Sequence, residues 1–158
     1  MSFVFIFIPP IVGFLSSLFC KYNISDDNLK PAFQPPNWVF QVVWNILYLL
    51  YGFCAYLALN NQFVDSNAIF LSIWFLNLLL NFSWTPIFAC DDSLNRSKIA
   101  LWVLIALIMT LLMLLTVTII QYRSLSMTLC LIPYITWLFV AYSLNLEIIR
   151  LRNNAEHH

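Results

Sequence analysis

Aromatic and amide side chains recur at helical spacing in three apolar stretches of the chain. The first stripe holds Asn37, Gln41, Trp44 with Asn45, Tyr48, Tyr51 with Gly52, and Ala55. The second holds Trp74, Asn77, Asn81, Trp84 and Thr85, and the third holds Pro133 with Tyr134, Trp137, Ala141, Leu144 with Asn145, and Ile148. Indole and phenol rings with hydrogen-bonding tips offer stacking faces and a few polar contacts. The stripes therefore favour the binding of a flat, apolar, ring-rich molecule.

The composition argues against most other chemistry. The chain has only two glycines and a net charge of zero, so a phosphate-binding loop and a nucleic-acid partner are not expected. Its two histidines, His157 and His158, end the chain like the remnant of an expression tag, and we expect 153–158 to be a tail without function. Without other histidines, a His-bound metal, a Ser-His-Asp triad and a Cys-His pair are excluded within one subunit. We expect no metal, no cofactor and no acid–base catalytic residue.

The four cysteines are scattered through the apolar sequence without a CxxC pair. They are Cys20, Cys54, Cys90 and Cys130. Free cysteine behaves as a small apolar side chain and is among the most buried residue types. We therefore expect reduced, buried thiols and no redox or metal role.

Five apolar runs must position the three stripes. The chain is 62% hydrophobic and 9% charged, whereas charged residues make up about a quarter of a soluble domain. Each run reaches the roughly 18 to 25 residues that cross a bilayer as a helix. The sequence therefore predicts an all-α membrane protein, a single domain over 1–152 built as a bundle of five transmembrane helices. The runs lie at about 3–20, 38–59, 68–89, 98–120 and 125–149.

The long connection 21–37 and the basic residues define one side of this bundle. Six basic residues belong to the side of that connection and of the C-terminus, whereas the other side holds only Arg123. The positive-inside rule then predicts a cytoplasmic C-terminus. At about 1.5 Å per residue, Trp44, Asn81 and Trp84 fall roughly 8 to 12 Å below that surface. We expect an aromatic pocket in the cytoplasmic half of the membrane, with 21–37 as its lid.

Two other helices offer less chemistry. The run 98–120 is nearly pure aliphatic, with threonines that can bond their own backbone, and we expect a lipid-facing scaffold. In the first run, Gly13 with Ser17 and Ser16 with Cys20 are spaced four apart, which lets helices approach closely. These small residues predict either a dimer face or packing within the chain.

Three motifs resemble the translocator protein family, also called the tryptophan-rich sensory proteins. They are Pro35-Pro36-x-Trp38-Val39-Phe40 with Trp44 and Leu47-Tyr48, then Leu80-Asn81-Phe82-Ser83-Trp84-Thr85-Pro86-Ile87-Phe88, then Pro133-Tyr134-x-x-Trp137 with Leu144-Asn145 and Arg150. The resemblance implies a multi-pass membrane protein, often a homodimer, of a bacterial or mitochondrial outer membrane. It implies binding of porphyrins such as protoporphyrin IX, of sterols, and of benzodiazepine-type drugs. The ligand positions it implies are Pro35, Trp38, Phe40, Trp44, Tyr48, Asn81, Trp84, Thr85, Leu104, Trp137 and Ala141.

Two positions depart from the family pattern. Val103 stands where many members carry an acidic residue, and Leu146 stands where the sterol motif of vertebrate members has a tyrosine. We therefore place porphyrin ahead of sterol. Three functions stay open: a binding protein or sensor for porphyrins, with or without transport; a light- and oxygen-dependent porphyrin-degrading enzyme, which is less favoured; and a membrane scaffold without a ligand.

Overall fold

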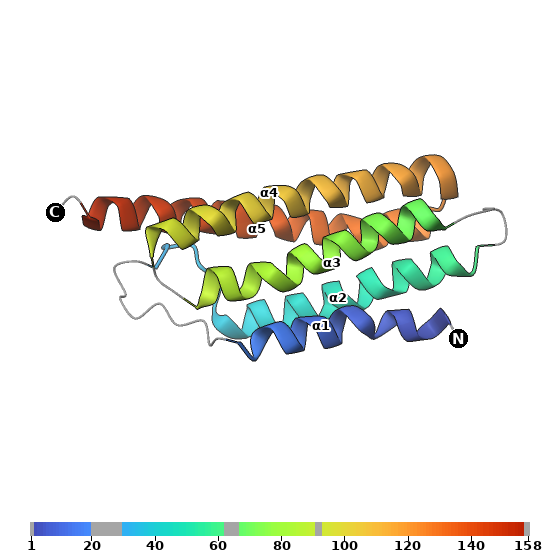
Figure 1. Ribbon diagram of the computed structural model, residues 1–158, viewed down its shortest axis with the longest axis horizontal. Coiled ribbons are helices and arrows are strands. Elements are labelled where there is room, and N and C mark those ends of the chain that lie inside the picture. Colours follow the sequence, from blue (N-terminus) through green and yellow to red (C-terminus); the bar gives the residue numbers. More distant parts are fainter. Residues whose placement is uncertain (1, 20–29, 62–66, 91–92, 157–158) are drawn as a thin grey trace.

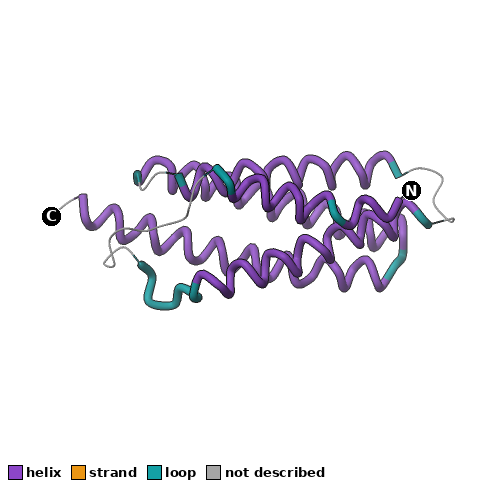
Figure 2. The backbone as a smooth tube through the Cα atoms, turned by 90° about the horizontal axis from the view of Figure 1, so that it is seen from below, coloured by secondary structure: helices purple, strands orange, loops and turns teal. Residues whose placement is uncertain are grey.

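The computed structural model describes residues 2–19, 30–61, 67–90 and 93–156, and every regular element in these ranges is a helix (Figures 1 and 2). The helices are α1 (Ile8–Ser17), α2 (Asn37–Leu59), α3 (Ala68–Ala89), α4 (Leu94–Val117) and α5 (Leu125–Glu156). A short 3-10 helix, η1 (Ser2–Ile6), precedes α1, and a π-helical turn, η3 (Thr118–Tyr122), continues α4. The predicted all-α fold is therefore confirmed. Helices α2 to α5 are also long and apolar enough to cross a membrane, as predicted.

The first helical segment is shorter than the predicted run 3–20. Pro9 and Pro10 stand in the first turn of α1, where their missing N–H groups cost no helical hydrogen bond. The chain therefore ends η1 at Ile6 and starts α1 as a separate helix. The apolar segment Ser2–Ser17 is shorter than the four spans that follow, and Cys20 lies outside the described residues.

The ends of α4 and α5 also differ from the prediction. Helix α4 begins at Leu94 because the Ser93 hydroxyl caps it, accepting the Arg96 backbone N–H at 3.4 Å. Helix α5 continues past 149 to Glu156, so much of the predicted tail is helical. The buried Arg152 guanidinium docks these last turns on α4, where it donates to the Ser93 carbonyl at 3.3 Å. Residues 157–158 lie outside the described part of the chain.

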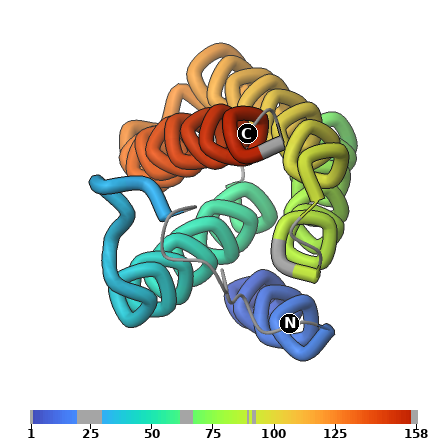
Figure 3. Tube along the Cα trace, turned by 90° about the vertical axis from the view of Figure 1, so that its left-hand side faces the viewer, coloured from blue at the N-terminus to red at the C-terminus, as the bar shows by residue number. Residues whose placement is uncertain are grey.

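Seen from one end, the helices form a ring in the order α1, α2, α5, α4, α3 (Figure 3). Helix α1 lies between α2 and α3 and packs against both. Gly13 contacts the Tyr48 ring, and the buried Ser16 hydroxyl donates to the Phe82 carbonyl at 2.8 Å. At Gly13 and Ser16, the small residues of α1 therefore serve packing within the chain, whereas Ser17 is exposed.

Helix α4 is more than the lipid-facing scaffold that its sequence predicts. Its outer face exposes Trp102 and Met109, but its inner face buries four leucines in the core of the bundle. The leucines are Leu104, Leu107, Leu111 and Leu114. The predicted threonine bonds are present, since Thr116 and Thr118 donate to carbonyls of their own helix at 2.9 and 2.8 Å.

The cysteines divide into two kinds. Cys54 and Cys130 are free and buried, as predicted. Cys90 is disulfide-bonded, so the prediction of a reduced thiol is wrong at this position. The difference follows from place in the fold, because Cys90 is exposed just beyond the last turn of α3, whereas Cys54 and Cys130 lie inside helices.

Candidate ligand-binding site

A buried asparagine joins three helices in the middle of the bundle. The Tyr48 hydroxyl on α2 donates to the Asn81 side-chain oxygen on α3 at 2.7 Å. The Asn81 side-chain nitrogen donates to the Tyr134 hydroxyl on α5 at 2.5 Å. We call these three residues the Asn81 layer. Because all three side chains are buried and bonded to one another, the layer fixes how α2, α3 and α5 align.

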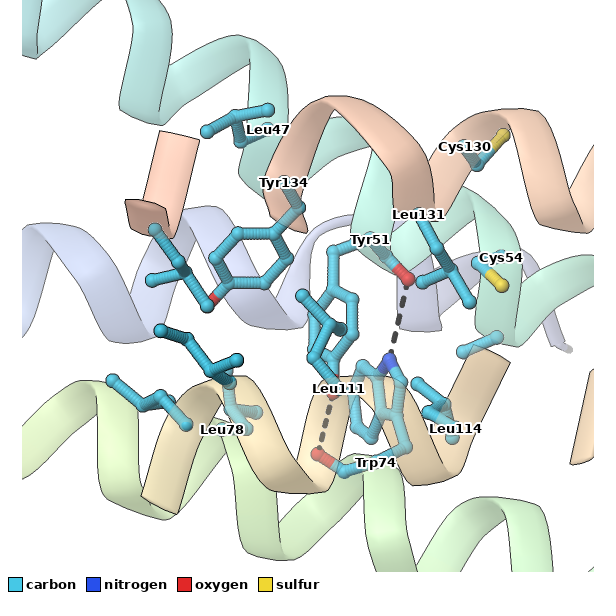
Figure 4. Close-up of a cluster of buried hydrophobic side chains, with 14 of the residues drawn as sticks. Leu47, Tyr51, Cys54, Trp74, Leu78, Leu111, Leu114, Cys130, Leu131 and Tyr134 are labelled. Carbon is cyan, nitrogen blue, oxygen red and sulfur yellow. Dashed lines mark hydrogen bonds between the residues drawn. The ribbon is translucent and has the colours of Figure 1, made fainter. Parts of the chain in front are cut away.

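On one side of the Asn81 layer the interior is closely packed. This side faces the end of the bundle where α2 finishes and α3 begins. The rings of Tyr51 and Trp74 stack with centroids 5.4 Å apart (Figure 4). Two hydrogen bonds reinforce the pair, from the Tyr51 hydroxyl to the Trp74 carbonyl at 3.0 Å and from the Trp74 indole to the Tyr51 carbonyl at 3.2 Å. Asn77 binds α4 here, donating to the Thr110 hydroxyl at 2.8 Å.

On the other side, facing the end where α3 and α5 finish, Trp44 meets rings from three helices. Its ring centroid lies 5.3 Å from that of Tyr48 on the same helix. The Tyr134 ring of α5 stands edge-on to it at 5.9 Å, and the Trp84 ring of α3 lies at 6.2 Å. These separations are those of interacting aromatic pairs. Trp44 and Trp84 therefore face the interior, as their stripes predict.

Further aromatic rings extend this group toward the same end of the bundle. Trp84 stacks on Phe88 with centroids 4.9 Å apart, and Phe40 of α2 meets Trp137 of α5 edge-on at 5.4 Å. The indole N–H groups of Trp84 and Trp137 are buried and have no hydrogen-bond acceptor among the described residues. We call Phe40, Trp44, Trp84, Phe88 and Trp137 the aromatic cluster. It combines rings packed on one another with two buried indole donors that have no acceptor among the described residues.

The other predicted site residues take different positions. Leu104 of α4 and Ala141 of α5 are buried in the interior, and Pro35 and Thr85 are half-buried. The Trp38 side chain is 65% exposed and faces outward. Much of the predicted lid, residues 21–29, lies outside the described residues.

The prediction that the polar residues of the first stripe face inward is wrong, because Asn37 is exposed. Gln41 and Asn45 are exposed, and the Asn45 amide donates to the Gln41 carbonyl at 2.8 Å. A helical asparagine can satisfy itself in this way, so its presence in an apolar run does not require a protein partner. Conversely, the family motif contains Phe88 but the predicted ligand positions do not include it, although it follows Trp84 by four residues, the spacing that brings two rings together on a helix.

The fold, with four helices long and apolar enough to cross a membrane, places the chain among integral membrane proteins. Within that class it belongs to the TspO/MBR family, whose model matches residues 5–151. The chain is 33% identical over 140 residues to the tryptophan-rich protein TspO of Archaeoglobus fulgidus, a match that covers 87% of each chain. It is 30% identical over 145 residues to protein CrtK of Rhodobacter capsulatus, covering 88% of this chain and 84% of that one. It is 26% identical over 151 residues to the translocator protein of Sus scrofa, covering 89% and 83%.

Proposed function

We propose that this protein binds flat, ring-rich apolar molecules, porphyrins first, against its aromatic cluster. The observation that carries the proposal is the position of Trp44, whose ring meets Tyr48, Trp84 and Tyr134 from three helices. Aromatic faces stack on extended ring systems, and sites for small molecules are mostly apolar with a few placed polar groups. A porphyrin offers the largest complementary ring surface of the expected ligands.

The Asn81 layer would form the floor of this site. Both ends of the Asn81 amide are already bonded, so Asn81 would act by holding Tyr48 and Tyr134 in place rather than by bonding a ligand. The ligand would then lie between this floor and the end of the bundle where α3 and α5 finish. Its proposed contacts are Pro35, Phe40, Trp44, Tyr48, Trp84, Thr85, Leu104, Trp137 and Ala141, with Trp38 at the outer edge.

Charge supports placing this end of the bundle in the cytoplasm. The described basic residues at that end are Lys30, Arg96, Lys98, Arg150 and Arg152, whereas Arg123 is alone at the other end. Basic residues concentrate on cytoplasmic loops of membrane proteins. The site would then be reached from the cytoplasm or from the inner half of the bilayer.

The role we propose is that of a binding protein or sensor. The name of one relative, translocator protein, fits a protein that passes on a ligand. Sterols rank behind porphyrins, because the exposed Leu146 supplies no hydroxyl where the sterol motif has a tyrosine.

The test is a titration of protoporphyrin IX into the purified protein in detergent, followed by porphyrin absorbance and tryptophan quenching. Trp44→Phe, Trp84→Phe and Trp137→Phe should each weaken binding by about threefold to tenfold, because each loses ring contact. Trp102→Phe is the matched control, since that indole is 70% exposed on the outside of α4. Equal affinity in all four variants and the wild type would mean that these rings only pack the bundle.

A further inference from the structure

Asn145 of α5 is buried without any partner for its amide. Its side chain is 0% exposed, and neither the nitrogen nor the oxygen has a hydrogen bond within the described part of the chain. The other two asparagines that are buried in the described part of the chain, Asn77 and Asn81, donate hydrogen bonds to neighbouring helices. Buried polar groups without partners are rare in folded proteins and call for a physical explanation.

The Asn145 amide also makes no bond to its own helix. Asn45 and Asn60 show that alternative, because each donates to the carbonyl four residues earlier, at 2.8 and 2.7 Å. The equivalent acceptor for Asn145 is the Ala141 carbonyl, and no such bond is present. The amide is therefore left with both its donor and its acceptor for another group.

Asn145 lies on the face of α5 that looks into the bundle. Residues 134, 138, 141, 145, 148 and 152 repeat at spacings of three and four, and all of them are buried. On this face Tyr134 bonds Asn81, and Arg152 bonds the Ser93 carbonyl and the Ser97 hydroxyl of α4. The polar residues on either side of Asn145 are thus both paired.

The residue of α4 that the helix register places opposite Asn145 is aliphatic. Helices α4 and α5 run antiparallel, and Ser97 of α4 contacts Arg152 of α5. Counting seven residues forward along α4 from Ser97 and seven residues back along α5 from Arg152 gives Leu104 and Asn145, which therefore lie at the same level. Leu104 and Ala141, one turn before Asn145, are both proposed ligand contacts, and neither side chain can form a hydrogen bond. Asn145 therefore adds a polar group to an otherwise apolar wall of the proposed site.

Unpartnered groups gather on this side of the Asn81 layer. The indole N–H groups of Trp84 and Trp137 lie here, as does the Asn145 amide. On the other side Tyr51 and Trp74 satisfy each other, and the one buried side-chain atom without a partner among the described residues there is the Asn77 oxygen. The unpaired hydrogen-bonding capacity thus coincides with the place proposed for a ligand.

We propose that Asn145 is the polar anchor of this site and pairs with a carboxylic acid group of the ligand in its neutral form. A side-chain amide has a donor and an acceptor side by side, and a neutral carboxylic acid offers the complementary pair. Two hydrogen bonds would then satisfy both atoms at once. Apolar surroundings favour the neutral form of an acid. This inference rests on the proposed function and adds a preference for porphyrins with acidic side chains.

The test compares three porphyrins that differ at their edge. Protoporphyrin IX carries carboxylic acids, its dimethyl ester keeps only the acceptors, and octaethylporphyrin has neither. Asn145→Leu should weaken binding of protoporphyrin IX by about tenfold, weaken the ester less, and leave octaethylporphyrin unchanged. Each porphyrin is compared between protein variants, so differences in porphyrin solubility cancel. Asn45→Leu is the matched control, because it removes an exposed amide from α2.

Thermal unfolding without ligand distinguishes binding from a structural role. Asn145→Leu should melt at or above the wild-type temperature, because it removes an unpartnered amide from the interior. Asn145→Ala repeats the affinity test without added bulk. Unchanged affinity for protoporphyrin IX in both variants would overturn this inference and leave the proposed function intact. A lower melting temperature with equal weakening for all three porphyrins would also overturn it. Failure of the wild type to bind any porphyrin would overturn the proposed function, and this inference with it.

Discussion

At the scale of single residues, Asn81 contributes by joining two tyrosines. Its oxygen accepts from Tyr48 and its nitrogen donates to Tyr134, so the amide is satisfied on both sides. Inside a membrane there is no water to replace a lost partner. The alignment of three helices at this depth therefore depends on one side chain.

Replacing Asn81 by leucine should destabilise the protein and disturb the site. Two buried phenol groups would lose their partner, and each unsatisfied group costs about 1–3 kcal/mol. We expect a lower melting temperature in detergent and weaker protoporphyrin binding. Asn45→Leu, on the exposed face of α2, should change stability by no more than about 0.5 kcal/mol. An Asn81→Leu protein as stable as the wild type would contradict the role given to this layer.

The spacing of residues in the sequence predicts part of the arrangement of side chains in the interior. The spacing of Trp74, Asn77, Asn81 and Trp84 predicts one buried face of α3, and all four side chains are buried. The same spacing rule places Asn45 inward, whereas it is exposed. Periodicity identifies residues that share a face but not whether a polar member bonds its own backbone, so the outward position of Asn45 could not be derived.

At the scale of helices, two glycines set how closely η1 and α1 approach α2. A Cβ atom at Gly13 of α1 would lie 2.1 Å from Cε2 of the Tyr48 ring. A Cβ atom at Gly52 of α2 would lie 2.4 Å from the backbone oxygen of Ile6 in η1. Both distances are too short for a Cβ atom to be tolerated without movement. At Gly13 the atom that must move belongs to the Tyr48 ring of the proposed site, whereas at Gly52 it belongs to the backbone of η1.

These glycines should therefore fail in different ways when changed to alanine. Gly13→Ala displaces the Tyr48 ring and with it the bond to Asn81, so protoporphyrin affinity should fall by about tenfold or more. Gly52→Ala pushes η1 away from α2 and should cost about 1–3 kcal/mol of stability with a smaller effect on affinity. Melting temperature and affinity measured on both variants check this. The reverse pattern would mean that Tyr48 does not shape the site.

The helix ends show which local signals suffice. The predicted start of the fourth run at about 98 rests on hydropathy, whereas α4 starts at Leu94 after the Ser93 cap, a serine signal that the sequence contains. The last turns of α5, up to Glu156, are held by the hydrogen bonds of Arg152 to Ser93 and Ser97, residues more than fifty positions away. Hydropathy does not predict such a contact. The disulfide at Cys90 is likewise a matter of spatial neighbours, which cysteine spacing does not reveal.

At the scale of the whole molecule, the ring of helices has two unlike halves. Helix α1 lies between α2 and α3 in the ring (Figure 3). The side chains of α2 and α3 meet across the interior in the hydrogen bond between Tyr48 and Asn81. On one side of this layer the stacked Tyr51 and Trp74 close the core. On the other side lie the aromatic cluster and Asn145, with their unpartnered donors. The fold thus has one half whose buried polar groups are mostly paired and another, with unpaired donors, in which we propose that a ligand binds.

The most direct test of a porphyrin site in that half uses the six tryptophans as reporters. Indole N–H signals of ¹⁵N-labelled protein in detergent would be assigned by single Trp→Phe variants and followed as protoporphyrin IX is added. A porphyrin bound against the aromatic cluster should shift the signals of Trp44, Trp84 and Trp137 strongly. Trp74, beyond the Asn81 layer, and Trp102, on the outside of α4, should stay in place. Shifts at Trp102 with Trp44, Trp84 and Trp137 unchanged would contradict a site inside the bundle.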